Sequence, residues 1–212
     1  MNKNWKIFLG VFIIPILISG CSSEGKLKIN NQTSARVFGE VNKSDFNISG
    51  GEEFSKKWDL NSSIFGNESK DIDIIYNGVY IWRDSISTEV EAGNTKKVKL
   101  LPVAGAIKII SSSDILDIVE VNIAAESEAF WGDNDLPEND FIEPGESVTW
   151  TVTDGNWDVR IVNNNGEVEE IFNLIIEIDS TYSIDYDGYK KSSIETSKLT
   201  GSGSNKGKVE IN

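Results

Sequence analysis

The stretch SVTWTVTDGNWDVRIV, residues 147–162, indicates the fold class of this chain. Apolar and polar residues alternate through residues 148–152 and again through residues 157–161, and this period of two is typical of half-buried β-strands. Asp154-Gly155 separates the two runs. An Asp-Gly pair in this position favours a tight hairpin because both residues tolerate positive φ. The stretch therefore predicts two neighbouring antiparallel strands.

Similar runs, separated by turn residues, recur along most of the chain. They cover residues 26–30, 35–42, 70–76, 79–82, 96–103, 106–110, 117–124, 147–152, 156–162 and 181–186. Asn77-Gly78 lies between two of these runs and predicts a second hairpin. No segment of helical length has a clear apolar period of 3.6 residues. The expected fold class is therefore all-β.

The two halves of the chain resemble each other at an offset of 80 residues. LKINNQTSARVFGEVN (27–42) lies over IKIISSSDILDIVEVN (107–122) without a gap. Weaker matches continue in the same order, between residues 76–82 and 153–159 and between residues 94–100 and 180–186. A unit of about 80 residues has the size of a small β-sandwich. We expect two tandem immunoglobulin-like antiparallel β-sandwich domains, over residues 26–103 and 105–187; chance similarity between β-rich segments is the alternative.

Three motifs of the second half resemble a repeat found in many bacterial lipoproteins and secreted proteins. They are WGDNDL (131–136), PGES (144–147) and DGNWDV (154–159), which follow the pattern W-G, L, P-G-E-S and G-x-W/Y-D-V/L-R. The repeat usually opens with an Asn-rich turn, where this chain has Ser111-Ser112-Ser113. The resemblance covers residues 105–186 and, more loosely, residues 26–103. The family is uncharacterised, so the resemblance implies a small all-β domain and no activity.

The N-terminal segment has the parts of a secretory signal peptide. Lys3 and Lys6 precede the apolar residues 7–18, which are too few to cross a hydrocarbon core of ~30 Å. Ile18-Ser19-Gly20-Cys21 resembles the lipobox of bacterial lipoproteins. This resemblance implies removal of residues 1–20, a diacylglyceryl thioether on Cys21, and acylation of the new N-terminus by a fatty acid such as palmitate. A buried helix or a short membrane anchor is the alternative.

A lipid at Cys21 would determine where the protein resides. Two or more acyl chains anchor a protein stably, so we expect a lipid-anchored protein of the cell envelope. Ser22 stands where an Asp often signals inner-membrane retention in Gram-negative lipoproteins, and this favours the outer membrane if the cell has one. Residues 22–25 precede the first expected strand and reach at most ~14 Å. The first domain is therefore expected close to the membrane.

Charge and residue types exclude several functions. The chain has 34 acidic and 20 basic residues and a net charge of −14, which argues against binding nucleic acid. It has no histidine, which excludes Ser–His and Cys–His catalysis and imidazole zinc sites. Cys21 is the only cysteine, so no disulfide is expected. Residues 188–212, rich in Ser, Gly and Lys, predict a disordered tail; contact with the acidic body or an anionic surface is the alternative.

The acidic loop EAFWGDNDLPENDF (128–141) holds the candidate binding residues. Trp131 is a candidate for stacking on a sugar or peptide, with Asp133, Asp135 and Asp140 as oxygen donors. The alternative is a tryptophan that closes one end of the sandwich. The carboxylates also suggest Ca²⁺. The loop lacks the D-x-[DN]-x-[DN]-G spacing, so an ordinary acidic loop is favoured and neither a metal nor another cofactor is expected.

These observations favour a non-enzymatic envelope lipoprotein that presents loops for binding a protein or glycan. A structural or accessory lipoprotein with a protein partner is the alternative. A carboxylate-based glycoside hydrolase is a remote third hypothesis, because a small chain of two sandwiches offers no obvious cleft.

Overall fold

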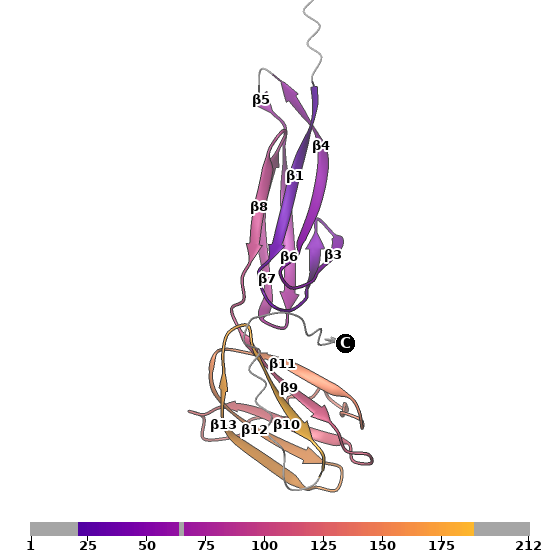
Figure 1. Cartoon of the computed structure of the whole chain (residues 1–212), viewed down its shortest axis with the longest axis vertical. Coiled ribbons are helices and arrows are strands. Elements are labelled where there is room, and N and C mark those ends of the chain that lie inside the picture. Colours follow the sequence, from indigo (N-terminus) through magenta and orange to yellow (C-terminus); the bar gives the residue numbers. More distant parts are fainter. Residues whose placement is uncertain (1–20, 64–65, 189–212) are drawn as a thin grey trace, which may run out of the picture.

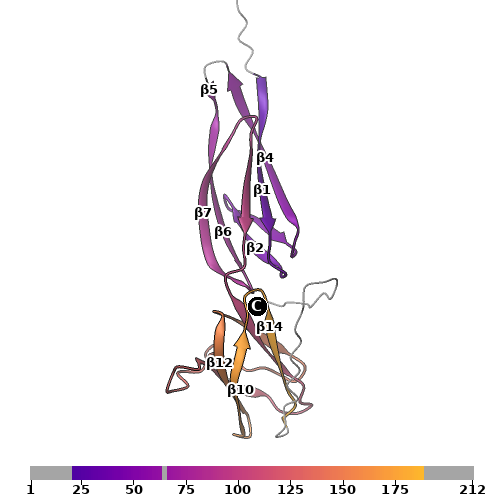
Figure 2. The same ribbon diagram turned by 60° about the vertical axis from the view of Figure 1, so that its left-hand side comes forward.

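The computed structural model describes residues 21–63 and 66–188, and these form two β-sandwiches that follow each other along the long axis (Figures 1 and 2). The signal peptide expected over residues 1–20 and the tail after Gly188 lie outside the described residues. The described chain contains 14 strands. None of its elements is a helix long and apolar enough to span a bilayer. The all-β prediction is therefore confirmed.

The first sandwich consists of two four-stranded sheets. One has the order β5-β4-β1-β8 and contains β1 (Cys21–Asn31), β4 (Glu53–Ser63), β5 (Gly66–Asn67) and β8 (Thr95–Leu100). The other has the order β3-β2-β6-β7 and contains β2 (Val37–Val41), β3 (Ser44–Ile48), β6 (Ser69–Gly78) and β7 (Ile81–Glu91).

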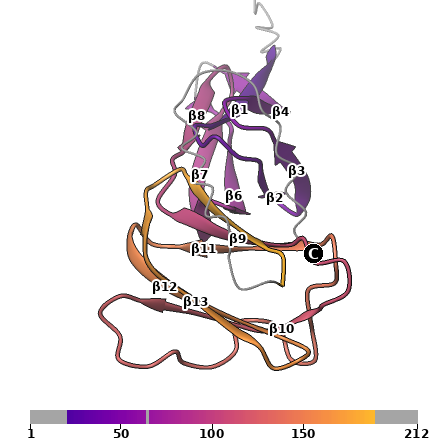
Figure 3. The ribbon, with the colours of Figure 1, turned by 60° about the horizontal axis from the view of Figure 1, so that its bottom comes forward.

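The second sandwich consists of two three-stranded sheets. One has the order β11-β9-β14 and contains β9 (Gly105–Ser111), β11 (Ser147–Val152) and β14 (Thr181–Tyr186). The other has the order β10-β12-β13 and contains β10 (Ile118–Ala125), β12 (Gly155–Asn163) and β13 (Val168–Ile176). Figure 3 shows that the β11-β9-β14 sheet lies between the first sandwich and the β10-β12-β13 sheet.

The two sandwiches share one topology. β1 pairs antiparallel with β4 and parallel with β8, as β9 pairs antiparallel with β11 and parallel with β14. The strands β2, β6 and β7 are hydrogen-bonded in the same order as β10, β12 and β13. Two tandem sandwiches are thus confirmed, with one difference from the expected antiparallel sheets. The last strand of each sandwich enters parallel to the first, because the chain crosses to the opposite sheet before it returns.

Each sandwich has its own apolar core. Leu27 and Ile29 of β1 and Ile107 and Ile109 of β9 are all 0% exposed. Burial of each such side chain contributes about 1.5–3 kcal/mol. Their neighbours Lys26, Lys28 and Lys108 are partly exposed, as the period of two requires. The offset of 80 residues therefore superposes equivalent core positions.

The buried side chain of Asn31 closes the turn after β1. Nδ2 of Asn31 donates to three backbone carbonyl oxygens, those of Ala35 (2.7 Å), Ile48 (3.1 Å) and Ser49 (3.1 Å). Oδ1 of Asn31 accepts from the N–H (3.0 Å) and the hydroxyl (2.9 Å) of Thr33. At the equivalent position of β9, the Oγ of Ser111 is buried and has no hydrogen-bond partner among the described residues. Ser111 thus does not provide the clamp that Asn31 provides in the first sandwich.

The prediction of a hairpin at Asp154-Gly155 is wrong. β11 pairs with β9, whereas β12 pairs with β10 and β13, so the chain crosses between the two sheets at this point. Gly155 has a φ of 138°, which suits the change of direction. The alternation of residues 148–161 shows that each strand is half-buried, but it does not say which sheet each strand joins. The proposed match between residues 76–82 and 153–159 is wrong for the same reason. Residues 76–82 run from β6 into β7, whereas residues 153–159 lead into β12, which is the counterpart of β6.

The hairpin predicted near Asn77-Gly78 exists, but its turn lies two residues later. β6 and β7 pair from Ser69↔Glu91 to Gly78↔Ile81, so Val79 and Tyr80 form the turn. Asn77 and Gly78 belong to β6. An added Cβ at Gly78 would lie 3.1 Å from the backbone oxygen of Arg36, which explains a glycine inside the strand.

The residues expected to link Cys21 to the first domain belong to β1. Ser22 is paired with Asn61, and Glu24 with Asp59. Gly25 allows this strand to continue, because an added Cβ would lie 2.6 Å from Leu60 Cδ1 and 2.8 Å from Val90 Cγ1. The run CSSEG has no apolar alternation, so the period of two could not reveal it as a strand. Residues 22–25 are therefore part of the first sandwich and do not form a linker between Cys21 and that sandwich.

The two sandwiches touch at the turn between β6 and β7. Val79 and Tyr80 form a small buried cluster with Ala106 of β9. The hydroxyls of Tyr80 and Thr181 share a hydrogen bond of 2.8 Å, and Thr151 Oγ1 donates to the carbonyl oxygen of Val79 (2.9 Å). Nearby, the N–H and hydroxyl of Ser34 donate to Asp179 Oδ1 (2.8 and 3.1 Å). These contacts hold the two sandwiches end to end.

Candidate functional site

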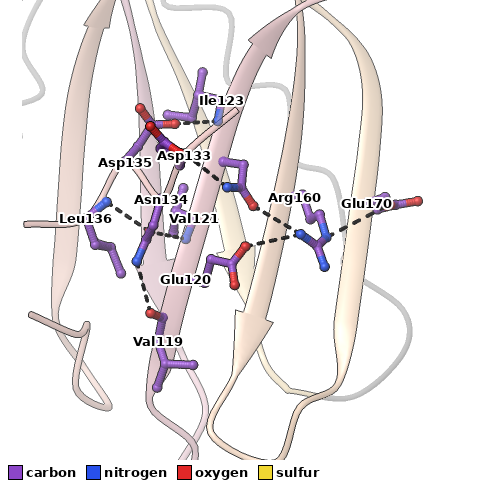
Figure 4. A network of polar contacts seen from close by, with 11 residues as sticks. Val119, Glu120, Val121, Ile123, Asp133, Asn134, Asp135, Leu136, Arg160 and Glu170 are labelled. Carbon is purple, nitrogen blue, oxygen red and sulfur yellow. Dashed lines mark hydrogen bonds and ion pairs between the residues drawn. The ribbon is translucent and has the colours of Figure 1, made fainter. Parts of the chain in front are cut away.

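The loop between β10 and β11, residues 126–146, lies along the free edge of β10 (Figure 4). The N–H of Asp135 donates to the carbonyl oxygen of Val121 (2.7 Å), and Oδ2 of Asp135 accepts from the N–H of Ile123 (2.6 Å). Asp135 thus takes the place that a neighbouring strand would have. It covers an edge that would otherwise be open to pairing with another chain.

Asn134 fixes the loop to the same edge. Its Oδ1 accepts from the N–H groups of Val121 (3.0 Å) and Leu136 (3.1 Å), and its Nδ2 donates to the carbonyl oxygen of Val119 (3.3 Å). Two apolar side chains add to this attachment, because Leu136 is 5% and Ile142 0% exposed. The middle of the loop is therefore held in place by both polar and apolar contacts.

Behind the loop, a polar network crosses the outer face of the β10-β12-β13 sheet (Figure 4). Nη1 of Arg160 donates to Glu120 Oε1 (3.1 Å) and to Asn122 Oδ1 (3.4 Å), and its Nε lies 4.0 Å from Glu170 Oε1. Nδ2 of Asn122 donates to the carbonyl oxygen of Asp133 (3.1 Å). Arg160 thus links all three strands, and Asn122 links them to the loop. Ion pairs as exposed as these contribute about 0–1 kcal/mol each to the stability of the fold.

Trp131 packs on the outer face of the sheet, away from the second core. Its ring centroid lies 5.8 Å from that of Phe172 at an interplanar angle of 43°. Phe172 belongs to β13 and is 55% exposed, and Phe130 is 85% exposed. Trp131 is half-buried and is not among the side chains packed against the second core, whereas Trp150 and Trp157 are. We call Phe130, Trp131 and Phe172 the aromatic patch.

The carboxylates of the loop have different environments. Asp135 is bonded to the β10 edge, and burial raises the pKa of its carboxyl although the N–H of Ile123 opposes this effect. Oδ1 of Asp140 accepts from the N–H of Phe141 (3.0 Å), and Asp133 is exposed. Within residues 21–63 and 66–188, no three acidic or cysteine side chains are grouped to hold a metal.

The structure places Trp131, Asp133 and Asp135 on one short stretch, with Asp140 further along the loop. Sequence reasoning missed Phe172, which completes the aromatic patch. Phe172 is exposed next to buried Ile171, and Asn173 has a φ of 59° where the register of the strand shifts. The run IFNLII does not alternate strictly, and this irregularity is the signal of a bulge that could have indicated an outward Phe172.

A concave surface lies on the first sandwich. It is an open depression of about 510 Å³ on β2 and β3, lined by Phe38, Gly39, Glu40, Asp45, Phe46 and Asn47. It lies on a different domain from the loop, so it is not part of the candidate site.

Comparison with known proteins adds the following. No protein-family model matches the chain, and no curated protein matches its sequence. Among solved structures, the chain is similar to the Bacillus anthracis TIE protein, with 15% identity, a TM-score of 0.31 and coverage of 78% of this chain and 34% of that one. This chain thus spans about a third of the TIE protein's length.

Two further structures are candidate cell adhesion proteins from Bacteroides species. The one from Bacteroides ovatus has 8% identity and a TM-score of 0.36, with coverage of 84% of this chain and 96% of that one. The one from Bacteroides fragilis has 10% identity and a TM-score of 0.29, with coverage of 72% and 79%.

Proposed function

We propose that this protein is a lipid-anchored component of the cell envelope that binds a protein or glycan through the aromatic patch. The observation that carries the proposal is the Trp131–Phe172 pair, which is held on the outer face of a sheet rather than in a core. Aromatic rings exposed beside fixed polar groups are characteristic of binding surfaces, since they offer large contact area and stack on sugar or peptide planes.

The loop's attachment supports a preformed site. The hydrogen bonds of Asn134 and Asp135 to β10 hold the residues that follow Trp131 in the chain. A partner would therefore not have to order this segment on binding, which lowers the entropic cost of association. Asp133 and the neighbouring carboxylates would supply polar contacts at the rim.

The position of the patch fits presentation away from a membrane. β1 begins at Cys21 at one end of the molecule, and the β10-β12-β13 sheet is the layer farthest from that end (Figures 1 and 3). If Cys21 carries the lipid implied by the lipobox, the first sandwich stands on the membrane and the patch faces outward. The localisation we propose is a lipid-anchored envelope protein, in the outer membrane if the cell has one.

The test compares the wild type with two tryptophan variants in two assays. One measures binding to a glycan array, and the other measures crosslinking to partners in intact envelopes. Trp131→Ala should weaken binding roughly 30-fold, the effect of losing about 2 kcal/mol at a tryptophan hot spot. Trp82→Ala is the matched control, because Trp82 is 47% exposed but lies on β7 of the first sandwich. Equal binding by all three proteins would contradict the proposal. A protein partner captured independently of Trp131 would instead support an accessory role.

A further inference from the structure

The outer face of the β5-β4-β1-β8 sheet carries a group of lysines in a chain whose net charge is −14. These are Lys26 and Lys28 of β1, Lys57 of β4, and Lys97 and Lys99 of β8, which we call the lysine face. Along β1 and β8 they alternate with buried core residues, so their side chains point to the same outer side. The three strands lie side by side in Figure 1.

The strand register places like charges directly opposite each other. Lys28 is paired with Lys97 in the parallel pair β1–β8, and Lys26 with Lys57 in the antiparallel pair β1–β4. Lys99 lies two residues beyond Lys97, about 7 Å along the strand. Like charges in opposite positions destabilise a sheet, by up to about 1 kcal/mol per pair. This arrangement therefore costs stability wherever acidic neighbours do not compensate the charge.

Acidic residues compensate only part of this charge. Lys28 forms an ion pair with Glu53 and Lys57 with Glu24, each at 2.6 Å. Among the described residues, Lys26, Lys97 and Lys99 have no ion pair with an acidic side chain. The other acid on this face, Asp59, lies opposite Glu24 toward the Cys21 end.

Glu53 lies beside several of these lysines, because its ion-pair partner Lys28 is paired with Lys97. The pKa of Glu53 is held below the ordinary value mainly by the hydrogen bond from Lys28, while burial, the next largest effect, acts in the opposite direction. The charges of Lys28, Lys26 and Lys97 lower it further. Three lysines thus act on one exposed carboxylate, and two of them remain available for another anion.

We infer that the lysine face binds a linear envelope polymer with a phosphate in each repeat. Two rows of ammonium groups along neighbouring strands match a chain of regularly spaced negative charges better than they match a single ion. Lysine acts as a mobile point charge toward phosphate and does not need the planar geometry of arginine pairs. The phosphates would remove the repulsion between Lys28 and Lys97. This surface lies on the first sandwich and is independent of the aromatic patch.

The experiment measures binding of the detergent-solubilised full chain to poly(glycerol phosphate) as a function of salt. The wild type should bind at low salt and lose affinity as salt rises. The triple variant Lys26→Gln, Lys97→Gln, Lys99→Gln should lose at least 10-fold in affinity at about 50 mM salt. Its slope of log K against log salt should become less negative by about 2, because each phosphate contact contributes about 0.7.

The control variant is Lys70→Gln, Arg83→Gln, Lys108→Gln, which changes net charge equally but lies on other strands. It should keep at least half of the wild-type affinity. The triple variant on the lysine face should unfold at a denaturant concentration similar to that of the wild type, because it loses repulsion from Lys28 and Lys57 together with attraction to Glu53, and loses no hydrogen bond. Equal losses in both variants, wild-type binding only to phosphatidylglycerol vesicles, or no salt-dependent binding to the polymer would each overturn the inference.

Discussion

Replacing Asn31 by serine, the residue found at the equivalent position 111, should strongly destabilise the first sandwich. Asn31 is 0% exposed, and its amide bonds three backbone carbonyls and both the N–H and hydroxyl of Thr33. A serine is too short to reach the carbonyls of Ile48 and Ser49. Thr33 Oγ1 keeps its bond to the carbonyl of Ala35 (2.9 Å), so part of the turn remains satisfied.

The magnitude follows from the number of groups that lose a partner. Each buried backbone group left unpaired costs about 1–3 kcal/mol. The carbonyl oxygen of Ser49 still accepts from the N–H of Glu52 (3.1 Å), so two groups lose a partner, the carbonyl of Ile48 and the N–H of Thr33. Asn31→Ser should therefore lower the free energy of unfolding of the first sandwich by about 2–5 kcal/mol. For a domain of this size, that corresponds to a decrease in Tm of at least about 8 °C.

The assay is urea denaturation followed by fluorescence, with Trp58 packed against the first core and Trp157 against the second. The control is Ser111→Ala, which removes a buried hydroxyl that has no partner and should change stability by less than about 0.5 kcal/mol. Similar shifts for Asn31→Ser and Ser111→Ala would refute the reasoning. The reasoning would also be refuted if Asn31→Ser shifted only the unfolding transition of the second sandwich, which Trp157 reports.

Three further predictions concern the loop and the anchor. Asn134→Ala should speed amide hydrogen exchange at Val121 and Leu136 and cost about 1–3 kcal/mol; unchanged exchange would show that the loop is held by other contacts. Because burial raises the folded-state pKa of Asp135, the folded protein binds more protons than the unfolded one. Protonation of Asp135 therefore stabilises the folded protein at low pH, and this stabilisation is lost as the pH rises above about 4. Asp135→Asn should therefore be more stable than wild type at pH 7, with the difference shrinking on acidification; a constant difference in a pH series of melts would contradict this. Cys21→Ser should move the protein from the membrane to the soluble fraction and abolish an acyl mass increment on the N-terminal peptide, and an unmodified wild-type thiol would refute the anchor.

Much of the fold could be predicted from local patterns. The alternation in residues 148–161 indicates strands because a half-buried strand needs apolar residues at every second position. The repeat at an offset of 80 residues places Leu27 and Ile107 at the same point of each core. The pairing of strands could not be predicted in this way, because a sandwich joins neighbouring segments within one sheet or across two. Asp154-Gly155 has the composition of a hairpin and serves as a crossing between sheets.

The candidate site was predictable only in part. The run DNDLPEND drew attention to the loop, but the sequence contains no sign that Asn134 and Asp135 would bond to the β10 edge. Phe172 is 41 residues from Trp131, so their contact depends on how the loop crosses the sheet. Similarly, the lysine face combines residues of three strands, and only the register brings Lys28 beside Lys97.

The parallel pairing of β1 with β8 has a mechanical consequence. If a membrane holds Cys21 while a ligand pulls on the second sandwich, the force enters at the start of β1 and leaves at the end of β8. Because the two strands run in the same direction, this tension slides them past each other in shear. The six residue pairs from Lys26↔Thr95 to Asn31↔Leu100 must then yield together instead of peeling apart one by one. The parallel pairing would thus resist tension applied along the length of the molecule.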